Sequence, residues 1–401
     1  MFIPGPVAVS HEVLAAQARP LIDHRGPEFS ELLQNIGRRL RPIFGTTQEA
    51  VLLGSSGTGG LEAAITNLFS PGDKLLACPV GVFGQRLIRI ARAFGCDVQE
   101  LETTSGDALD RHRLADVLHS DANRAIRGIL LTHNETSTGV QNDMAAISAA
   151  IGTHPALRLI DAVSGLGASE FKMDAWGYDV VVSASQKVLA APPGLSMIAV
   201  SQRAWTSMQN SAAPRFYFDL RKAREFAQNG QTPWTPPVSI LFALHAALAR
   251  YEEQGDINVW RRHEGYARAI AAAARSMGLQ LFSRPGAHSR TVVAIAIPET
   301  VDAQKLLQTL RERWGVILSA GQQELRGKII RMGTMGDLSP GDIIAGLAAL
   351  ESALWEQRRE TKIGMGVAAA VQAFSEIQNA TRDAVPKSDA PVDAQTTAAF
   401  R

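Results

Sequence analysis

The chain of 401 residues is long enough for two domains, and its net charge of +1 gives no electrostatic reason to expect a nucleic acid or an anionic membrane as partner. Its two cysteines, Cys78 and Cys96, exclude a disulfide framework and a four-cysteine metal site. No apolar run approaches the roughly 20 residues of a membrane span, and the N-terminal MFIPGPVAVS lacks the basic start of a secretory signal. We therefore expect a cytoplasmic protein without a metal, whose partners are small molecules or further copies of itself.

Short apolar runs alternate with amphipathic segments from residue 50 to residue 201, which is typical of an α/β fold with a mainly parallel sheet. A doubly wound sheet binds ligands at the carboxyl ends of its strands, so the residues that follow each strand are candidates for chemistry. The predicted strands and helices, in chain order, cover residues 50–54, 58–69, 74–80, 83–95, 96–102, 110–119, 126–133, 144–152, 157–165, 178–185 and 194–201.

A second pattern follows the long predicted helix 239–254. Helices and short strands alternate there in a compact α+β unit, which predicts a smaller second domain. The stretch 365–378 favours one more helix, whereas 381–401 is poor in large apolar residues and is predicted to be disordered. We therefore predict an N-terminal segment, a large domain, a small C-terminal domain and an extension, at residues 1–15, 16–250, 251–360 and 361–401.

The glycine-rich stretch SSGTGG, residues 55–60, lies between a predicted strand and a predicted helix. Backbone N–H groups at the start of a helix favour a phosphate group, although a tight turn between two elements has the same composition. No Gly-Lys-Ser/Thr follows, and the glycine spacing differs from the dinucleotide fingerprint. The stretch is thus either an ordinary turn or a phosphate site for another kind of cofactor.

Lys187 stands in a short polar hinge between two apolar strands, and Asp161 ends another strand. The strand ends of one sheet can bring the two side chains to one site. A desolvated lysine can form a Schiff base with an aldehyde, and a carboxylate can pair with a pyridinium nitrogen. With a phosphate site beside them, these features match pyridoxal phosphate. A surface lysine and a capping aspartate are the alternative interpretations.

Two further stretches follow strands. Phe83 in VGVFGQR is either a ring that stacks on an aromatic cofactor or a core side chain. The stretch THNETSTG, residues 132–139, is rich in hydroxyls and amides, as a site for ring substituents would be, and an ordinary turn has the same composition.

As a set, six stretches resemble the class V aminotransferases of fold type I, in particular the branch of alanine:glyoxylate, serine:glyoxylate and serine:pyruvate aminotransferases. The resemblance covers the chain from IPGP at the N-terminus to IIRMG near residue 330. It implies a large domain with a mainly parallel sheet flanked by helices, and a smaller C-terminal α+β domain. The six stretches are SSGTGG, VGVFGQR, THNETSTGV, DAVSG, SASQK and PPGLSMIAVS.

The resemblance also implies a role for each candidate residue. Lys187 would form the Schiff base with pyridoxal phosphate, and Asp161 would pair with the pyridine nitrogen. Gly5 and Arg331 would bind the substrate, the arginine through the substrate carboxylate. The phosphate would be bound by Ser56, Gly57, Thr58 and Gln186. Phe83 and Val163 would pack on the two faces of the ring, and Thr136 would contact its side.

Members of this family are homodimers with the active site at the subunit interface. Thr235 in WTPPVS resembles the residue that reaches the phosphate of the neighbouring subunit. Some relatives place a tyrosine shortly before this threonine, whereas QTPW stands here. The resemblance gives no role to the C-terminal extension.

The implied reaction is a two-stage, ping-pong transamination from alanine or serine to glyoxylate or pyruvate, with Lys187 as general base. Other amino donors in neighbouring branches are 2-aminoethylphosphonate, ureidoglycine and pyridoxamine. A cysteine desulfurase would need a late nucleophilic cysteine, and no cysteine follows Cys96. A nicotinamide-dependent dehydrogenase and a catalytically silent scaffold subunit are rivals from other classes. The missing dinucleotide fingerprint argues against the first, and the retained lysine, aspartate and arginine against the second.

Overall fold

The computed structural model describes residues 1–383. Its larger sheet is mainly parallel, as predicted, because only β9 runs antiparallel to its two neighbours, β1 and β8. From one edge to the other the described strands are β1 (Ala50–Leu53), β9 (Ser196–Val200), β8 (Val180–Ala184), β7 (Leu157–Asp161), β4 (Ile126–Thr132), β2 (Lys74–Cys78) and β3 (Asp97–Glu100). A two-stranded hairpin, β5 (Asn134–Glu135) and β6 (Val140–Gln141), follows β4.

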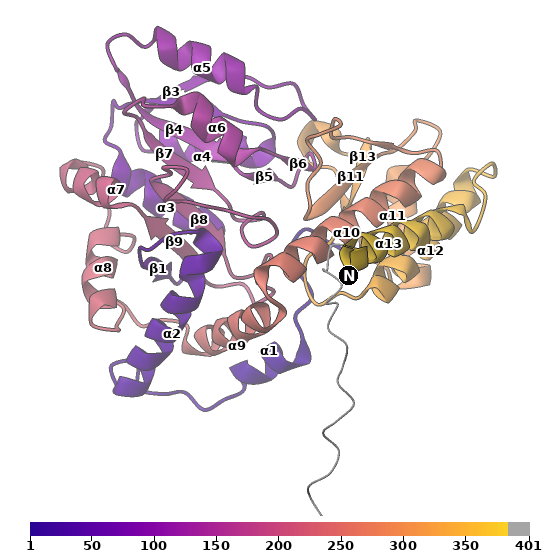
Figure 1. The fold of residues 1–401 in the computed structure, drawn as a ribbon, viewed down its shortest axis with the longest axis horizontal. Helices are drawn as coiled ribbons and strands as arrows, with labels where there is room; N and C mark the ends of the chain where they lie inside the picture. Colours follow the sequence, from indigo (N-terminus) through magenta and orange to yellow (C-terminus); the bar gives the residue numbers. More distant parts are fainter. Residues whose placement is uncertain (384–401) are drawn as a thin grey trace, which may run out of the picture.

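Both faces of this sheet are covered, which explains why its central strands are continuous apolar runs. Every residue of β7, β8 and β9 is buried. Alternate residues of each strand join one of two hydrophobic clusters, because successive side chains of a strand point to opposite faces. Figure 1 shows the helices around the sheet.

One face is covered by α1 (His11–Gln17), α2 (Pro27–Phe44), α5 (Arg111–Ser120), α6 (Met144–Ile151) and α9 (Val238–Gln254). The other face is covered by α3 (Gly57–Leu68), α4 (Val82–Ala93), α7 (Gln202–Ser207) and α8 (Leu220–Gln228).

A second, antiparallel sheet lies beside the first (Figure 1). Its strands are β10 (Gln280–Leu281), β11 (Val292–Ala296), β13 (Ile329–Gly333) and β12 (Ser319–Ala320). A separate hydrophobic cluster joins it to α10 (Asp256–Ser276), α11 (Ala303–Trp314), α12 (Pro340–Gln357) and α13 (Met365–Asp383). Between α9 and α10 stands Gly255, whose φ of 74° lies in the left-handed region that favours glycine. The domain boundaries at residues 15, 250 and 360 stay predictions.

The N-terminal segment connects the two parts of the molecule. Phe2 joins the cluster of the second sheet, whereas Val7 and Val13 join that of the first. Backbone hydrogen bonds hold the segment on the way: Gly333 N–H donates to the Phe2 oxygen over 2.6 Å, and Asp337 N–H donates to the Ala8 oxygen over 2.9 Å. The segment therefore crosses between the sheets in a defined position.

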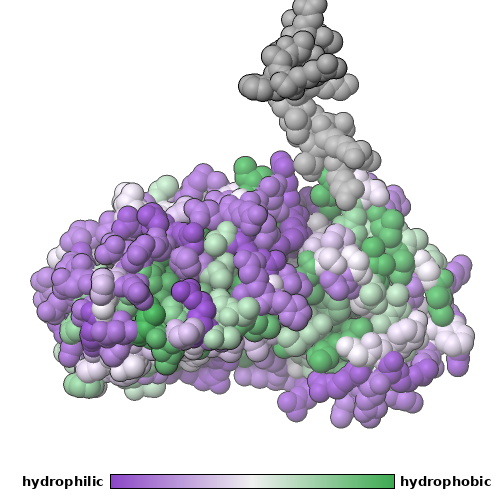
Figure 2. All heavy atoms as spheres, turned by 90° about the horizontal axis from the view of Figure 1, so that it is seen from below, coloured by the Kyte–Doolittle hydropathy of each residue, from purple (hydrophilic) through white to green (hydrophobic). Residues whose placement is uncertain are grey.

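Helix α13 packs against α10 and α12. It runs to Asp383, three residues into the stretch 381–401 that the sequence predicts to be disordered, and the rest of that stretch lies outside the described residues. Figure 2 shows apolar residues gathered on the side of the molecule that carries α10 to α13. Exposed large side chains of this region include Trp355, Ile363 and Val371. Within residues 1–383, no helix combines the length and apolar character that crossing a bilayer requires.

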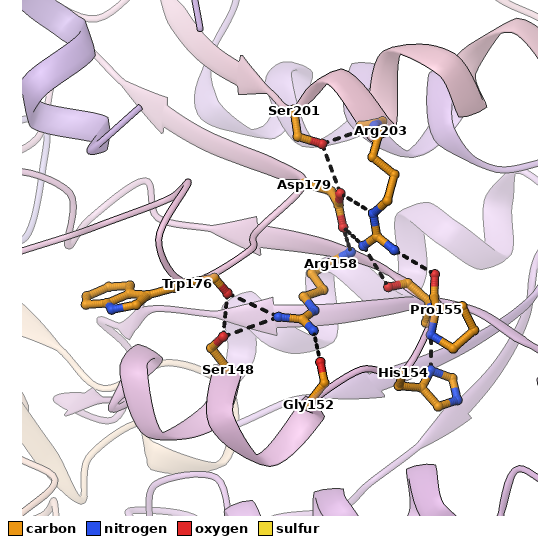
Figure 3. A network of polar contacts seen from close by, with 11 residues as sticks. Ser148, Gly152, His154, Pro155, Arg158, Trp176, Asp179, Ser201 and Arg203 are labelled. Atoms are coloured by element: carbon orange, nitrogen blue, oxygen red, sulfur yellow. Dashed lines mark hydrogen bonds and ion pairs between the residues drawn. The ribbon is translucent and has the colours of Figure 1, made fainter. Parts of the chain in front are cut away.

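A polar network centred on the buried carboxylate of Asp179 ties together the amino ends of β7 and β8 (Figure 3). The Asp179 carboxylate accepts hydrogen bonds from the Arg158 N–H over 2.8 Å and from the Arg203 Nε over 2.9 Å, and it also pairs with Arg203 Nη2. The Arg158 guanidinium donates to the main-chain oxygens of Gly152, over 2.5 Å, and Trp176, over 3.1 Å. The network fixes the sheet at the end opposite to the carboxyl ends of the two strands.

Candidate active site

A pocket of about 120 Å³ lies at the carboxyl ends of β7 and β8. Asp161 is the last residue of β7, and Lys187 follows the end of β8 by three residues. Of the predicted cofactor ligands, all but Thr235 line this pocket, namely Ser56, Gly57, Thr58, Phe83, Thr136, Asp161, Val163, Gln186 and Lys187. The fold thus brings together residues that span more than a hundred positions of the chain.

The start of helix α3 forms one end of the pocket. Ser56 is the N-cap residue, yet its hydroxyl makes no capping hydrogen bond. A Cβ atom at Gly57 would lie 2.7 Å from Val163 Cγ2, so a larger residue would push the helix start away from the pocket wall. Free backbone N–H groups and the positive end of a helix dipole favour an anion at this position.

Asp161 is buried, and its carboxylate accepts a hydrogen bond from the Val163 N–H over 3.0 Å. Burial raises the pKa of this carboxyl to about 6, although the cationic Arg86 and Lys187 act in the opposite direction. At neutral pH the group is therefore a buried anion, which is stabilised by a cationic ligand atom.

Burial lowers the pKa of the Lys187 amine to about 8, against the opposing effect of the Asp161 carboxylate. The positive charges of Arg331 and Arg86 lower it further. An amine with such a pKa is partly uncharged, and thus partly available as a nucleophile, just above neutral pH, whereas an ordinary lysine is almost fully protonated there. Its nitrogen donates a hydrogen bond to the Pro4 oxygen over 2.6 Å.

Gly5 follows directly in the N-terminal segment and has a φ of 114°. A Cβ atom there would lie 2.7 Å from the Lys187 nitrogen. Glycine is therefore required for this close approach, and the role of Gly5 in substrate binding stays a prediction.

Arg331 comes from β13 of the second sheet and is buried. Its Nη1 donates to the Thr136 oxygen over 2.8 Å, and its Nε donates to the Ala320 oxygen over 3.0 Å. Because Thr136 lines the pocket, the guanidinium lies directly behind the pocket wall. Two main-chain carbonyls fix its orientation and leave its remaining N–H groups for a carboxylate.

Thr235 lies elsewhere. It lines a separate small pocket with Tyr217 and Trp234, beside β1. Within one chain this threonine is therefore not part of the lysine pocket.

A larger pocket of about 690 Å³ lies between α10, β11 and α13 and contains none of the predicted site residues. The residues that could carry chemistry gather instead in the pocket of about 120 Å³ around Lys187. Its polar lining, with a buried carboxylate and a partly buried amine, marks it as the candidate site.

The model of the family described as aminotransferase class-V matches residues 9–332. The chain belongs to the class V aminotransferases. Enzymes of this family depend on pyridoxal phosphate, and the chain is a pyridoxal-phosphate-dependent aminotransferase with the fold type I architecture.

Relatives match this class V aminotransferase over nearly its full length. The L-aspartate–glyoxylate aminotransferase of Paracoccus denitrificans is 38% identical and shares 93% of this chain and 96% of its own length. A protein of Anabaena cylindrica that is named soluble hydrogenase 42 kDa subunit is also 38% identical, over 94% of this chain and 98% of its own. The solved pyridoxamine–pyruvate aminotransferase from Mesorhizobium loti superposes with a TM-score of 0.89 at 32% identity, over 94% of this chain and 97% of that structure.

The pocket fits the cofactor of the class V aminotransferases. The Gln186 Oε1 atom lines it, is buried and has no hydrogen-bond partner among residues 1–383. A buried anion at Asp161 and a partly buried amine of lowered pKa at Lys187 match a pyridinium nitrogen and an aldehyde. The uncapped start of α3 matches the phosphate.

Sequence reasoning missed several residues of the site. Arg86 lies one helical turn after Phe83, with its guanidinium 4.7 Å from the centre of the Phe83 ring and its Nη1 donating to the Thr58 hydroxyl over 3.3 Å. The i, i+3 spacing in VGVFGQR could have indicated it. Further lining residues that were missed are Leu61, Asn134 and Ser164.

Proposed function

We propose that this class V aminotransferase moves the amino group of a small amino acid, alanine or serine, to glyoxylate or pyruvate by a ping-pong mechanism. One observation carries the proposal. The partly buried amine of Lys187 and the buried carboxylate of Asp161 line one pocket with the open start of helix α3. This combination supports covalent amine chemistry on an anionic, aromatic cofactor.

We assign the cofactor ligands as follows. The start of α3, with Ser56, Gly57, Thr58 and Gln186, would hold the phosphate. Asp161 would hold the pyridinium nitrogen in its protonated form. The ring would lie between Phe83 and Val163, with Thr136 at its side, since all of these residues line the same pocket.

Bound pyridoxal phosphate supplies an aldehyde that accepts an amine and a ring that takes up an electron pair. Lys187 would hold the cofactor through its side-chain nitrogen, and the same nitrogen, once free, would act as the general base that takes up the α-proton of the donor and gives it back. Arg331 binds the donor carboxylate and orients the α-hydrogen toward Lys187. Asp161 would place a negative charge beside the ring nitrogen. The same residues act in reverse order on the acceptor.

We propose that the enzyme is a homodimer whose partner subunit supplies Thr235. The separation of Thr235 from the lysine pocket within one chain supports this arrangement. So does an exposed aromatic cluster beside it, in which Phe216 stacks on Trp234 and has 75% of its surface exposed. Large exposed aromatic groups are typical of protein interfaces. Sedimentation analysis should give twice the chain mass of 43.0 kDa.

L-Aspartate is a second candidate donor, because the relative from Paracoccus denitrificans bears that substrate in its name. The additional cation Arg86 in the pocket lining supports a donor with a second carboxylate. The donors 2-aminoethylphosphonate, ureidoglycine and pyridoxamine remain further alternatives. The cytoplasmic location stays a prediction.

The test is the absorption spectrum of the purified enzyme, loaded with pyridoxal phosphate, before and after each candidate donor is added without an acceptor. A true donor converts the cofactor band in one half-reaction and releases one equivalent of 2-oxo acid, and glyoxylate or pyruvate then restores the band. Lys187→Ala serves as the control and should not cycle. A wild-type enzyme that shows a lysine-dependent band but no conversion by alanine, serine or aspartate would reject the proposed donors.

A further inference from the structure

Glu135 is a fully buried carboxylate directly behind the pocket. It belongs to β5 and precedes the pocket residue Thr136. Its two oxygens accept four hydrogen bonds, and no ion pair to it occurs among residues 1–383. Burying a carboxylate costs free energy unless hydrogen-bond donors satisfy its oxygens, and here four donors do so.

One oxygen of Glu135 caps helix α4. Oε2 accepts the N–H groups of Phe83, over 3.0 Å, and Gly84, over 3.1 Å. The N-cap residue of this helix, Gly81, has no side chain that could do so. A Cβ atom at Gly81 would lie 2.6 Å from Glu135 Cγ. The glycine therefore leaves the space in which the Glu135 side chain reaches the start of the helix. A negative charge at the start of a helix is stabilised by the helix dipole.

The other oxygen holds the opposite wall of the pocket. Oε1 accepts the N–H of Ser137 over 3.1 Å and its hydroxyl over 2.6 Å. The Ser137 hydroxyl oxygen in turn accepts a hydrogen bond from the Val82 N–H over 3.0 Å. The main-chain oxygen of Glu135 accepts the Gly139 N–H over 3.0 Å, which closes the turn that contains Thr136.

The second sheet is tied to the same point. Thr136 accepts a hydrogen bond from Arg331 Nη1 over 2.8 Å through its main-chain oxygen. Burial lowers the pKa of Arg331, and the Glu135 carboxylate acts in the opposite direction. Displacing Glu135 would therefore disturb the orientation of this arginine and remove a negative charge that stabilises its cationic form.

We propose that Glu135 is a positioning residue that sets the distance between Phe83 on one side of the pocket and Thr136, with Arg331 behind it, on the other. All four of its bonds come from donors, so the ionised carboxylate is the form that satisfies them. A glutamine has only one acceptor oxygen and must turn its NH₂ group toward two donors. This inference rests on the proposed function only through the roles given to Phe83, Thr136 and Arg331.

The test compares Glu135→Gln with Glu351→Gln in the full-length enzyme. Glu351 is the matched control, because it is also a buried carboxylate at a helix start and accepts the N–H groups of Gly364, over 2.8 Å, and Gly366, over 2.6 Å. Both variants lose bonds of the same kind, and only Glu135 adjoins the pocket. The measurements are the dissociation constant of pyridoxal phosphate with the apoenzyme, the KM of the amino donor and the melting temperature.

Both variants should melt at a lower temperature than wild type. Glu135→Gln should also weaken cofactor binding and raise the donor KM, each by about 10-fold or more, because two charge-assisted bonds are lost. Glu351→Gln should change neither by more than about 2-fold. A Glu135→Gln enzyme that melts earlier yet binds cofactor and donor like wild type would overturn the proposal and leave Glu135 a structural cap.

If Glu135→Gln does not fold, Ser137→Ala takes its place, since it removes one bond to Oε1 and the acceptor of the Val82 N–H. A folded Ser137→Ala enzyme should bind the cofactor several-fold more weakly, and unchanged binding would overturn the proposal. Failure of the proposed function is a different result, because the wild-type enzyme itself would then show no lysine-dependent cofactor band.

Discussion

The Lys187 side-chain nitrogen and the Pro4 main-chain oxygen lie 2.6 Å apart in a hydrogen bond that joins positions 183 residues apart in the chain. The lysine comes from the hinge after β8, and Pro4 from the segment that crosses between the two sheets. The N-terminal segment therefore lies directly against the lysine of the candidate active site, and the lysine is held by a neutral acceptor rather than by an ion pair within residues 1–383.

Gly5→Ala should lower kcat/KM by about 10-fold or more. Its φ of 114° is strained for alanine, and the added Cβ atom would lie 2.7 Å from the Lys187 nitrogen. Gly364→Ala is the matched control, since Gly364 has a φ of 96° with no neighbouring atom within 4 Å of an added Cβ. Steady-state kinetics should show the loss for Gly5→Ala alone. Equal losses in the two variants would mean that backbone strain, and not contact with the lysine, is responsible.

Lys187→Met should stabilise the apoprotein, and the gain should depend on pH. The pKa of Lys187 falls from 10.5 to about 8 on folding, so the unfolded chain binds more protons between these two values. Wild-type stability therefore rises from pH 8 to pH 10.5. The advantage of the variant, about 3 kcal/mol below pH 8, should vanish toward pH 10.5. Denaturant unfolding at pH 7, 9 and 10 measures this, with the exposed Lys172→Met as the reference. A gain that is constant with pH would contradict the lowered pKa.

Arg331→Lys should raise the KM of the amino donor by about 10-fold to 100-fold with a smaller effect on kcat. Lysine keeps the charge but cannot bind Thr136, Ala320 and a carboxylate at the same time, as the planar guanidinium can. The exposed Arg313→Lys should have wild-type kinetics. A KM that stays within 2-fold of wild type in Arg331→Lys would remove this residue from substrate binding.

Asp179→Asn should lower the free energy of unfolding by about 3 kcal/mol while the kcat of the folded enzyme stays unchanged. The substitution leaves Arg203 and the Arg158 N–H without a buried carboxylate, and the network lies at the end of the sheet away from the pocket. Chemical denaturation measures the loss. Glu49→Gln, in an exposed ion pair with Arg41, should cost less than about 1 kcal/mol. A large fall in kcat for Asp179→Asn would show that the two ends of the sheet are coupled.

Much of the fold could be predicted because each strand and helix leaves its own pattern in a short stretch of sequence. The central strands are buried on both faces, so they appear as unbroken apolar runs that end in polar residues such as Asp161. The pocket could be predicted for a related reason, since the strand ends of a parallel sheet meet at one edge. A lysine between two buried strands, a terminal carboxylate and a glycine-rich helix start are visible in the amino-acid order itself.

The support of the site could not be predicted in this way. Glu135 caps a helix that begins more than fifty residues earlier, and Pro4 meets a lysine from the middle of the chain. Arg331 reaches the pocket wall from another sheet. The sequence alone determined which side chains could do the chemistry, because nucleophile, anion and phosphate site follow from residue type and strand order. Only the tertiary structure decided what holds them, because hydrogen bonds between distant backbone groups leave no periodic pattern along the chain.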